Sequence, residues 1–310
     1  MTTLNVMENI LITGGSGFLG KNLKELFPNG SVLIPTRSEL NLLDIENVKR
    51  YFKGNQVEFI IHAAGNVGGI MHHKKNPATI MSENLQMGIN LIDAAAKDKV
   101  KKIIFISTVC VYPEIAQLPI KEDSLYHGYP AFDTSFYGIA KRTLKTLLDA
   151  YRIEFDLNAI TIIPTNLYGP HDYYDNDRSH VVAALLKRFH DAKLHHLPEV
   201  IIWGDGSQVR DFLYVKDCAH WIKLALESPV QNEILNFGSS KGTTIQELVE
   251  LISEIVGYTG RVIWDKTKPI GAQKRLLDIR NSRKILGYTP LTNLRDGLIE
   301  TYEYFKKNEI

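Results

Sequence analysis

The sequence has few cysteines and no long hydrophobic run. Only two of its 310 residues are cysteine, Cys110 and Cys218, too few to hold a chain of this length together with disulfides. No stretch approaches the roughly 20 apolar residues of a membrane-spanning helix. The polar start, residues 1–8, is unlike a signal peptide. We therefore expect a soluble, cytoplasmic protein with no membrane partner.

An excess of charge of either sign is also missing. The sequence has 36 Lys and Arg against 35 Asp and Glu, a net charge of +1, so we expect no nucleic-acid partner. Internal repeats, low-complexity tracts and Ser/Gly linkers are absent as well. With 44% hydrophobic residues, the composition is that of a globular protein. We expect two lobes packed together.

What the sequence does contain is an alternation of short apolar runs and amphipathic stretches. Amphipathic stretches at 80–97 and 136–152 predict helices between the apolar runs. Such alternation predicts an α/β fold, with a Rossmann-type doubly wound parallel sheet and a smaller α/β C-terminal lobe. The predicted strands are 10–13, 32–34, 59–64, 103–106 and 159–163.

The pattern changes after Pro164. Residues 166–180 are rich in Gly, Pro, Asp and Tyr and predict a loop, followed by a helix at 181–193. We place the cofactor domain at residues 1–165 and the substrate domain at 166–310. Part of 205–235 is a candidate to pack back onto the first domain.

A glycine-rich turn directly follows the first predicted strand. The literal G-x-G-x-x-G is met by Gly15, Gly17 and Gly20, and Gly14 adds a further glycine. Such glycines allow a tight turn and the approach of a dinucleotide pyrophosphate. Because the turn lies between a strand and a helix, we favour dinucleotide binding over an ordinary sharp turn. The predicted contacts are Gly14, Gly15, Ser16, Gly17, Phe18, Leu19 and Gly20.

The end of the second strand indicates which dinucleotide binds. NAD-binding folds carry an acidic residue about 20 positions after the glycines, whereas this strand ends Pro35-Thr36-Arg37-Ser38. Arg37 is suited to pair with a 2′-phosphate, so we predict NADP(H). Asp44 either contacts the adenine edge or caps the helix that starts at residue 45.

A hydroxyl, a phenol and an amine form the candidate reductase site. Thr108 follows the fourth strand, and Tyr137 and Lys141 are four residues apart on one predicted helix. A phenol has a pKa of about 10, so we expect the Lys141 charge to stabilise its phenolate. Thr108 would hold a carbonyl oxygen.

These elements, in this order, resemble the extended short-chain dehydrogenase/reductase superfamily. More local strings resemble its GDP-L-fucose synthase family, and the likeness runs from Ile10 almost to the C-terminus. The strings are Val67-Gly68-Gly69-Ile70, Thr108-Val109-Cys110-Val111-Tyr112-Pro113, Pro164-Thr165-Asn166-Leu167-Tyr168-Gly169-Pro170-His171-Asp172 and Ser179-His180-Val181.

The resemblance implies roles for further residues. It makes Thr108, Tyr137 and Lys141 the reductase triad, and Cys110 and His180 the pair that moves protons at sugar carbons C3 and C5. Without it, Cys110 would be a buried turn residue and His180 a helix-start histidine. Asn66 stands where a lysine is frequent. Further implied cofactor contacts are Ala63, Ala64, Tyr137, Lys141, Pro164, Asn166, Leu167 and His180. Implied GDP-sugar contacts are Asn166, Arg188, Trp203, Arg210, Lys274 and Arg275.

The resemblance implies an NADPH-dependent 3,5-epimerase and 4-reductase of GDP-4-keto-6-deoxy-D-mannose. One alternative is a C4 reductase of another GDP-4-keto sugar, a heptose or dideoxyhexose, with little or no epimerase activity. Another is an NADP(H)-sensing protein without turnover. The resemblance also implies a homodimer through the helices at 80–97 and 136–152.

We expect no metal site. Residues 72–75 (His-His-Lys-Lys) lack acidic or Cys partners at ligand spacing, and they predict a solvated or phosphate-facing loop.

Overall fold

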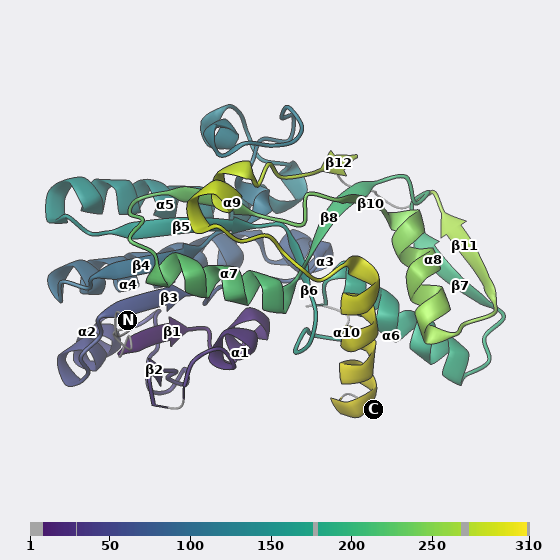
Figure 1. Ribbon diagram of the computed structural model, residues 1–310, viewed down its shortest axis with the longest axis horizontal. Coiled ribbons are helices and arrows are strands. Elements are labelled where there is room, and N and C mark those ends of the chain that lie inside the picture. Colours follow the sequence, from purple (N-terminus) through teal and green to yellow (C-terminus); the bar gives the residue numbers. More distant parts are fainter. Residues whose placement is uncertain (1–8, 29, 176–178, 268–272, 309–310) are drawn as a thin grey trace.

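The first lobe is built on a six-stranded parallel sheet (Figure 1). The computed structural model describes residues 9–28, 30–175, 179–267 and 273–308. The strands run in the order β2-β1-β3-β4-β5-β9, and every pair in this sheet is parallel. They are β1 (Ile10–Thr13), β2 (Val32–Leu33), β3 (Phe59–His62), β4 (Lys102–Ile106), β5 (Ala159–Pro164) and β9 (Ile234–Phe237). The predicted fold class and its five strands are confirmed.

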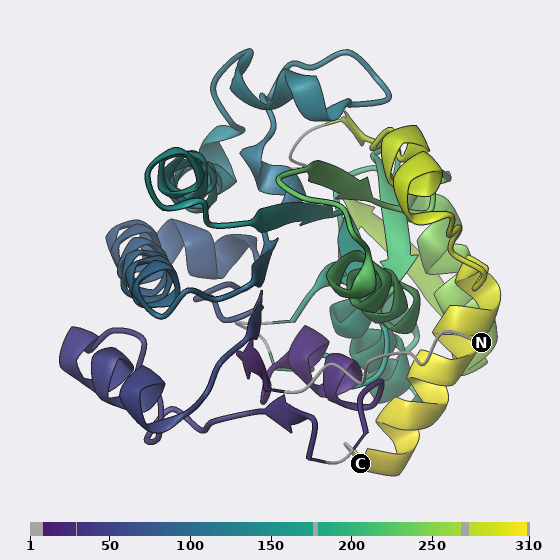
Figure 2. The same ribbon diagram turned by 60° about the vertical axis from the view of Figure 1, so that its left-hand side comes forward.

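Helices cover both faces of this sheet (Figure 2). On one face of the sheet, apolar side chains such as Leu11 and Ile103 pack with α2, α4 and α5. On the other face, side chains such as Ile12 and Ile104 pack with α1 and α7. Alternate side chains of a strand point to opposite faces, so these strands are apolar throughout. The helices are α1 (Phe18–Lys24), α2 (Ile45–Gly54), α4 (Pro77–Lys97), α5 (Ser135–Phe155) and α7 (Val215–Glu227).

The order of the strands fixes where a ligand binds. The chain moves from β1 outward to β2 and then returns to the other side of β1 for β3. The connection after β1 therefore runs to one side of the sheet and the connection after β3 runs to the other. In open α/β sheets, ligands bind at the carboxyl ends of the strands where the connections diverge in this way. The glycine turn follows β1 and the segment 63–69 follows β3, so both lie at this edge.

The second lobe has its own core and two small sheets. In the larger one, β8 pairs antiparallel with β10 and parallel with β12 and β6. In the smaller one, β7 and β11 are parallel. The strands are β6 (Asn166–Tyr168), β7 (Glu199–Trp203), β8 (Val209–Tyr214), β10 (Gly242–Thr244), β11 (Arg261–Asp265) and β12 (Lys274–Arg275). The helices beside them are α6 (Val181–Leu194), α8 (Ile245–Val256) and α10 (Leu294–Asn308).

The chain returns to the first sheet after entering the second lobe. β9 pairs with β5, and the preceding α7 packs on α1. The short helix α9 (Arg280–Leu286) packs on β9 and α7. The domain boundary near residue 166 stays a prediction.

Two local expectations were wrong. The segment after Pro164 is not all loop, because Asn166–Tyr168 forms strand β6 against β8. Residues 70–75 form a helix, α3 (Ile70–Lys75), rather than a solvated loop. In the described part of the chain, no helix has the length and apolar character to cross a membrane.

Candidate active site

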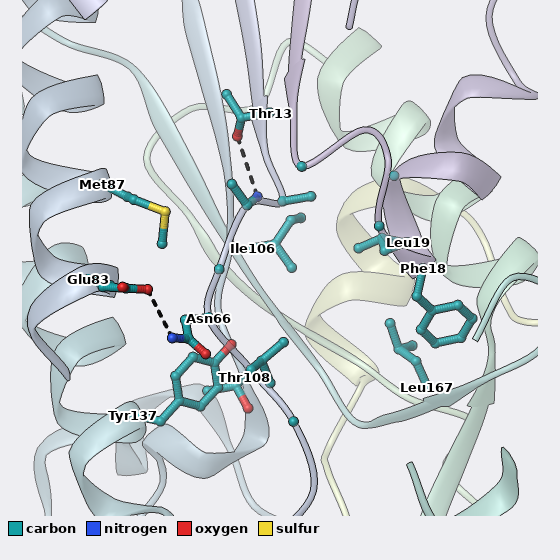
Figure 3. A pocket seen from close by; sticks show the side chains of 18 of the residues that line it. Thr13, Phe18, Leu19, Asn66, Glu83, Met87, Ile106, Thr108, Tyr137 and Leu167 are labelled. Atoms are coloured by element: carbon teal, nitrogen blue, oxygen red, sulfur yellow. Dashed lines mark hydrogen bonds between the residues drawn. The ribbon is translucent and has the colours of Figure 1, made fainter. Parts of the chain in front are cut away.

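A cavity of about 680 Å³ lies at the carboxyl ends of the central strands (Figure 3). Its walls come from the turns after β1, β3, β4 and β5, from α4 and α5, and from the segment before α6. Figure 3 places Tyr137 and Thr108 close together, with Phe18, Leu19 and Leu167 on the opposite wall. Predicted cofactor contacts that line it beside the glycine turn are Arg37, Ala63, Ala64, Tyr137, Pro164, Asn166, Leu167 and His180.

The glycine turn is as tight as the sequence predicts. Gly14 has a φ of +72°, and a Cβ there would lie 2.6 Å from the Ala64 nitrogen. A Cβ on Gly20 would lie 2.2 Å from the Gly14 carbonyl oxygen. Larger residues at 14 and 20 would therefore push the turn off β3 and α1. All seven residues from Gly14 to Gly20 line the cavity.

The far end of the cavity carries Arg37, which follows β2 and lines the wall. Asp44 is outside the lining and caps α2, accepting hydrogen bonds from the backbone nitrogens of Glu46 (3.0 Å) and Asn47 (3.1 Å). A contact of Asp44 with adenine stays a prediction. The wall thus offers glycines at its centre and a cation at one end, a donor set that suits NADP(H).

Tyr137 and Thr108 present their hydroxyl groups to the cavity, with Lys141 buried behind them. Tyr137 is 7% exposed and Lys141 is 3% exposed. The Lys141 Nζ donates a hydrogen bond to the Ile106 carbonyl oxygen at 3.0 Å and lies 5.8 Å from the centre of the Tyr137 ring. Lys141 is therefore placed to act through its charge rather than by touching the cavity surface.

Burial shifts the pKa values of both Tyr137 and Lys141. Burial raises the pKa of Tyr137, and the nearby Cys110 raises it further, so the phenol is held in its protonated form. Burial lowers the pKa of Lys141 to about 8. Stabilisation of the phenolate by the Lys141 charge, once the proton has left, stays a prediction. Tyr137 is thus arranged as a proton donor.

Cys110 reaches the cavity on a short 3₁₀ turn (Val109–Val111) after β4. Thr108 caps this turn, its Oγ1 accepting a hydrogen bond from the Cys110 nitrogen at 3.2 Å. A Cβ on Gly138 would lie 2.2 Å from the Cys110 carbonyl oxygen. Gly138, beside Tyr137, therefore lets α5 approach Cys110. The predicted reductase residue Tyr137 and the predicted epimerase residue Cys110 are thus brought close together.

Two histidines near this wall are held neutral. His73 on α3 is 7% exposed and lies 5.5 Å from the Tyr137 ring between centres. Burial and the charge of His72 lower the pKa of His73 to about 4. Burial and the charge of Lys141 lower the pKa of His62, beneath Phe105, to about 3. Both rings thus add no competing charge near pH 7.

His180 enters the cavity from the second lobe, directly before α6. The centre of its ring lies 5.9 Å from the centre of the ring of Phe18, the first residue of α1. Its Nδ1 is 2.9 Å from Oδ1 of Asp172. Burial opposes the charged ring, but the charge and hydrogen bond of Asp172 outweigh it, so the pKa of His180 is raised. His180 is thus favoured as an acid.

The predicted GDP-sugar residues divide into two sets. Asn166 lines the cavity, whereas the others lie outside its lining, in the second lobe. Arg188 donates a hydrogen bond at 2.8 Å to the carbonyl oxygen of Ile201 on β7. Trp203, the last residue of β7, is 44% exposed. Their sugar-binding roles stay predictions. The residues outside the lining are Arg188, Trp203, Arg210, Lys274 and Arg275.

Arg210 and Arg275 are neighbours in register on β8 and β12. Arg275 is 9% exposed and donates a hydrogen bond to the Pro113 carbonyl oxygen at 2.6 Å. Burial lowers the pKa of Arg275, and attraction to a negative Cys110 opposes that effect. The Arg275 guanidinium of the second lobe thus lies near enough to Cys110 of the first for the two groups to interact. Lys274, its neighbour, is exposed.

A polar network that the sequence analysis missed lines the wall beside Tyr137. Asn66 donates a hydrogen bond from Nδ2 to Glu83 on α4 at 2.9 Å (Figure 3) and accepts one from His72 Nε2 at 2.8 Å. Asn84 holds the backbone of Asn66 through two further hydrogen bonds. No local sequence signal connects residue 66 with α4. Among the described residues, no group of three or more His, Cys, Asp or Glu side chains is arranged to hold a metal ion.

Known proteins resemble this chain over nearly its whole length. The NAD dependent epimerase/dehydratase family matches residues 10–238. GDP-L-fucose synthase 1 of Arabidopsis thaliana is 38% identical and GDP-L-colitose synthase of Yersinia pseudotuberculosis is 34% identical. The alignments cover 96% of this chain in both cases, and 93% and 97% of those proteins.

A solved structure shares the fold as well. The GDP-L-fucose synthetase of Naegleria fowleri bound to NADP has a TM-score of 0.89 and 26% identity, over 99% of this chain and 95% of that one. The chain therefore belongs to the NAD dependent epimerase/dehydratase family and, within it, to the group of nucleotide-sugar enzymes that includes the GDP-L-fucose synthases.

Proposed function

We propose that this protein is an NADPH-dependent enzyme that epimerises GDP-4-keto-6-deoxy-D-mannose at C3 and C5 and reduces it at C4, giving GDP-L-fucose. One observation carries the proposal: a single cavity is lined by the glycine turn, by Tyr137 and Thr108, and by Cys110 and His180. A hydride site, an oxyanion site and two proton-transfer groups therefore face the same space. The likeness to the Arabidopsis GDP-L-fucose synthase supports the substrate.

The residues along the cavity fit NADP(H). The close backbone packing at Gly14 and Gly20 forms the turn that a pyrophosphate requires, and Arg37 lies where it can pair with a 2′-phosphate. Ala63, Ala64, Pro164 and Leu167 supply apolar wall. When bound, the cofactor supplies the hydride for C4. The NADP held by the Naegleria relative supports this choice over NAD.

In the proposed reduction, Tyr137 gives a proton to the C4 oxygen. The raised pKa of Tyr137 keeps the phenol protonated until the oxygen gains charge. Thr108 donates a second hydrogen bond to that oxygen, and the buried charge of Lys141 stabilises the phenolate that remains.

In the proposed epimerisation, the Cys110 thiolate removes the proton from a carbon next to the C4 ketone. The C–H bond breaks, an S–H bond forms, and the electron pair moves to the ketone oxygen, which Tyr137 and Thr108 hold. His180 then gives its Nε2 proton to the opposite face of the same carbon as the electron pair returns from the oxygen, so that the carbon inverts. Water takes the proton from Cys110 and returns one to His180, which readies both groups for the second carbon. The exchange takes place at C3 and at C5, since both adjoin C4.

The test is to identify the product. The protein is incubated with NADPH and GDP-4-keto-6-deoxy-D-mannose, and the sugar is analysed by NMR. We expect GDP-L-fucose. A product with the D configuration at C3 and C5 would refute the epimerase part, and no reduction of this ketone would refute the substrate.

A second candidate is a C4 reductase of another GDP-4-keto sugar, such as a dideoxyhexose or heptose. The likeness to GDP-L-colitose synthase favours it, as does Asn66, which replaces a frequent lysine beside Tyr137. Parallel incubations with these ketones distinguish the two. A sensor without turnover is disfavoured, because a sensor needs no proton donor such as Tyr137.

We further propose a homodimer formed through α4 and α5. These helices pack side by side and expose apolar side chains: Ile89 is 42%, Ile153 is 80% and Phe155 is 52% exposed. Analytical ultracentrifugation tests this, and a monomer at micromolar concentration would contradict it.

A cytoplasmic location is also proposed, supported by both cysteines being free thiols.

A further inference from the structure

A buried carboxylate contacts the histidine that enters the cavity from the second lobe. Oδ1 of Asp172 lies 2.9 Å from Nδ1 of His180, and Asp172 is only 4% exposed. The same oxygen accepts a hydrogen bond from the Tyr173 backbone nitrogen at 2.8 Å. The carboxylate is therefore held by the neighbouring backbone as well as by the histidine.

This contact determines which nitrogen of His180 carries a proton in the neutral ring. An ionised carboxylate only accepts hydrogen bonds, so Nδ1 must be the donor. Nε2, on the far side of the ring, is then the nitrogen left for the cavity that His180 lines. Phe18 packs against the ring from α1 and limits its rotation.

The charges around the ring make Asp172 the dominant partner. Phe18, from α1, carries no charge. From α3 the ring faces His73, whose pKa of about 4 keeps it neutral near pH 7. Cys110 and Tyr137 line the same cavity as His180. Among the described residues, Asp172 is thus the carboxylate that contacts His180 and favours its protonated form.

We propose that Asp172 is the positioning residue for His180: it holds Nδ1, directs Nε2 into the cavity and keeps the ring ready to donate a proton. This role rests on the proposed function, in which His180 returns a proton to the sugar carbon. Asp172 does not touch the substrate in this scheme. It acts through the orientation and charge state of the histidine, as carboxylates do beside other active-site histidines.

The test compares Asp172→Asn with Asp172→Ala in the NADP⁺-bound protein. The Asn side chain can still accept hydrogen bonds from Tyr173 and His180 but has no charge, whereas Ala loses both. Asp191→Asn is the matched control, because Asp191 is a half-buried carboxylate on α6 that pairs with Lys187. Thermal melting checks that the variants are folded.

The first measurement is the NMR titration of His180 in ¹⁵N-labelled protein, assigned with His180→Gln. We expect Asp172→Asn to lower the pKa of His180 by about one unit or more, as loss of a neighbouring opposite charge does. We expect Asp172→Ala also to lose the preference for a proton on Nδ1. An unchanged titration and tautomer in both variants would overturn the proposal.

The second measurement is the rate of deuterium uptake at C3 and C5 from D₂O. We expect Asp172→Asn to slow uptake about tenfold or more near pH 7, with the loss smaller at lower pH, and the Kd for NADPH to stay unchanged. Normal uptake in folded variants would also overturn the proposal. If the wild-type protein shows no uptake, the proposed epimerase fails, yet the NMR titration still decides whether Asp172 controls His180.

Discussion

The two halves of the candidate active site are built differently. Thr108, Tyr137 and Lys141 all belong to the first lobe, at the end of β4 and on α5, and the phenol and the amine are almost fully buried. The proton-transfer pair is divided: Cys110 follows β4, whereas His180 comes from the second lobe and its side chain is 36% exposed. With the proposed roles, reduction depends on one edge of the first sheet, whereas epimerisation depends on how the two lobes meet.

This difference suggests how one fold supports two activities. In the proposed mechanism, the hydroxyl groups of Tyr137 and Thr108 bind the C4 oxygen and serve both steps, since both steps place charge on that oxygen. In the same proposal, Cys110 and His180 add proton exchange at C3 and C5 without changing that oxygen site. Loss of Cys110 or His180 should therefore remove epimerisation alone. Loss of Tyr137 should weaken both epimerisation and reduction.

The largest expected effect comes from Cys110→Ser. An alcohol is a far weaker base than a thiolate, so deuterium uptake at C3 and C5 should fall below detection. Slow NADPH oxidation should persist, giving the D-configured product. Cys218→Ala is the control, because Cys218 lies in the core away from the cavity. Uptake at the wild-type rate in Cys110→Ser would remove the cysteine from the mechanism.

Tyr137→Phe should weaken both activities. Removing a general acid typically costs roughly 10²- to 10⁴-fold in rate, and single-turnover NADPH oxidation measures it. Deuterium uptake should fall as well, while NADPH still binds. Tyr126→Phe should have no effect, since the Tyr126 hydroxyl is at the surface beside Thr146. If uptake is untouched in Tyr137→Phe, the two halves do not share an oxygen site.

The pH dependence of reduction sharpens the comparison. Burial lowers the pKa of Lys141 to about 8, so its positive charge is present below that pH and is lost as the pH rises through it. NADPH oxidation should therefore decline above about pH 8. Lys141→Arg should move the decline to higher pH, because arginine stays charged. A flat wild-type profile up to pH 9.5 would show that this charge is not needed.

The smallest effect is expected from Arg37→Ala. Arg37 follows the edge strand β2 and lines the cavity away from the reductase residues and the proton-transfer pair. Losing a hydrogen-bonded charge on the 2′-phosphate should cost about 1.5 to 3 kcal/mol, roughly ten- to a hundredfold in kcat/KM for NADPH. The value for NADH should be unchanged. Arg50→Ala, an exposed arginine on α2 outside the cavity lining, is the control. Equal use of both cofactors by the wild type would contradict this assignment.

The sequence was sufficient where the signal is local. The glycine turn, the Tyr137 and Lys141 spacing and the five strands follow from patterns within a few residues of one another, and the structure has all of them. The position of β9 beside β5 was not predictable in this way, because 70 or more residues separate the paired strands.

The site residues that were missed depend on long-range contacts. Asp172 stands eight residues before His180 in an irregular segment, and no periodicity predicts that they touch. The effect of burial on the pKa of Tyr137 was not predictable either, because burial is a property of the packed site and not of the Tyr and Lys spacing. Arg275 acts on Cys110 only because β12 pairs with β8.

The central claim is that one cavity epimerises and then reduces the same sugar. The most direct measurement is to run the wild-type reaction in D₂O with GDP-4-keto-6-deoxy-D-mannose and NADPH, and to determine by NMR where deuterium enters the product. We predict deuterium at both C3 and C5 of GDP-L-fucose. Efficient reduction to a product with no deuterium at either carbon would contradict the claim and leave a plain C4 reductase.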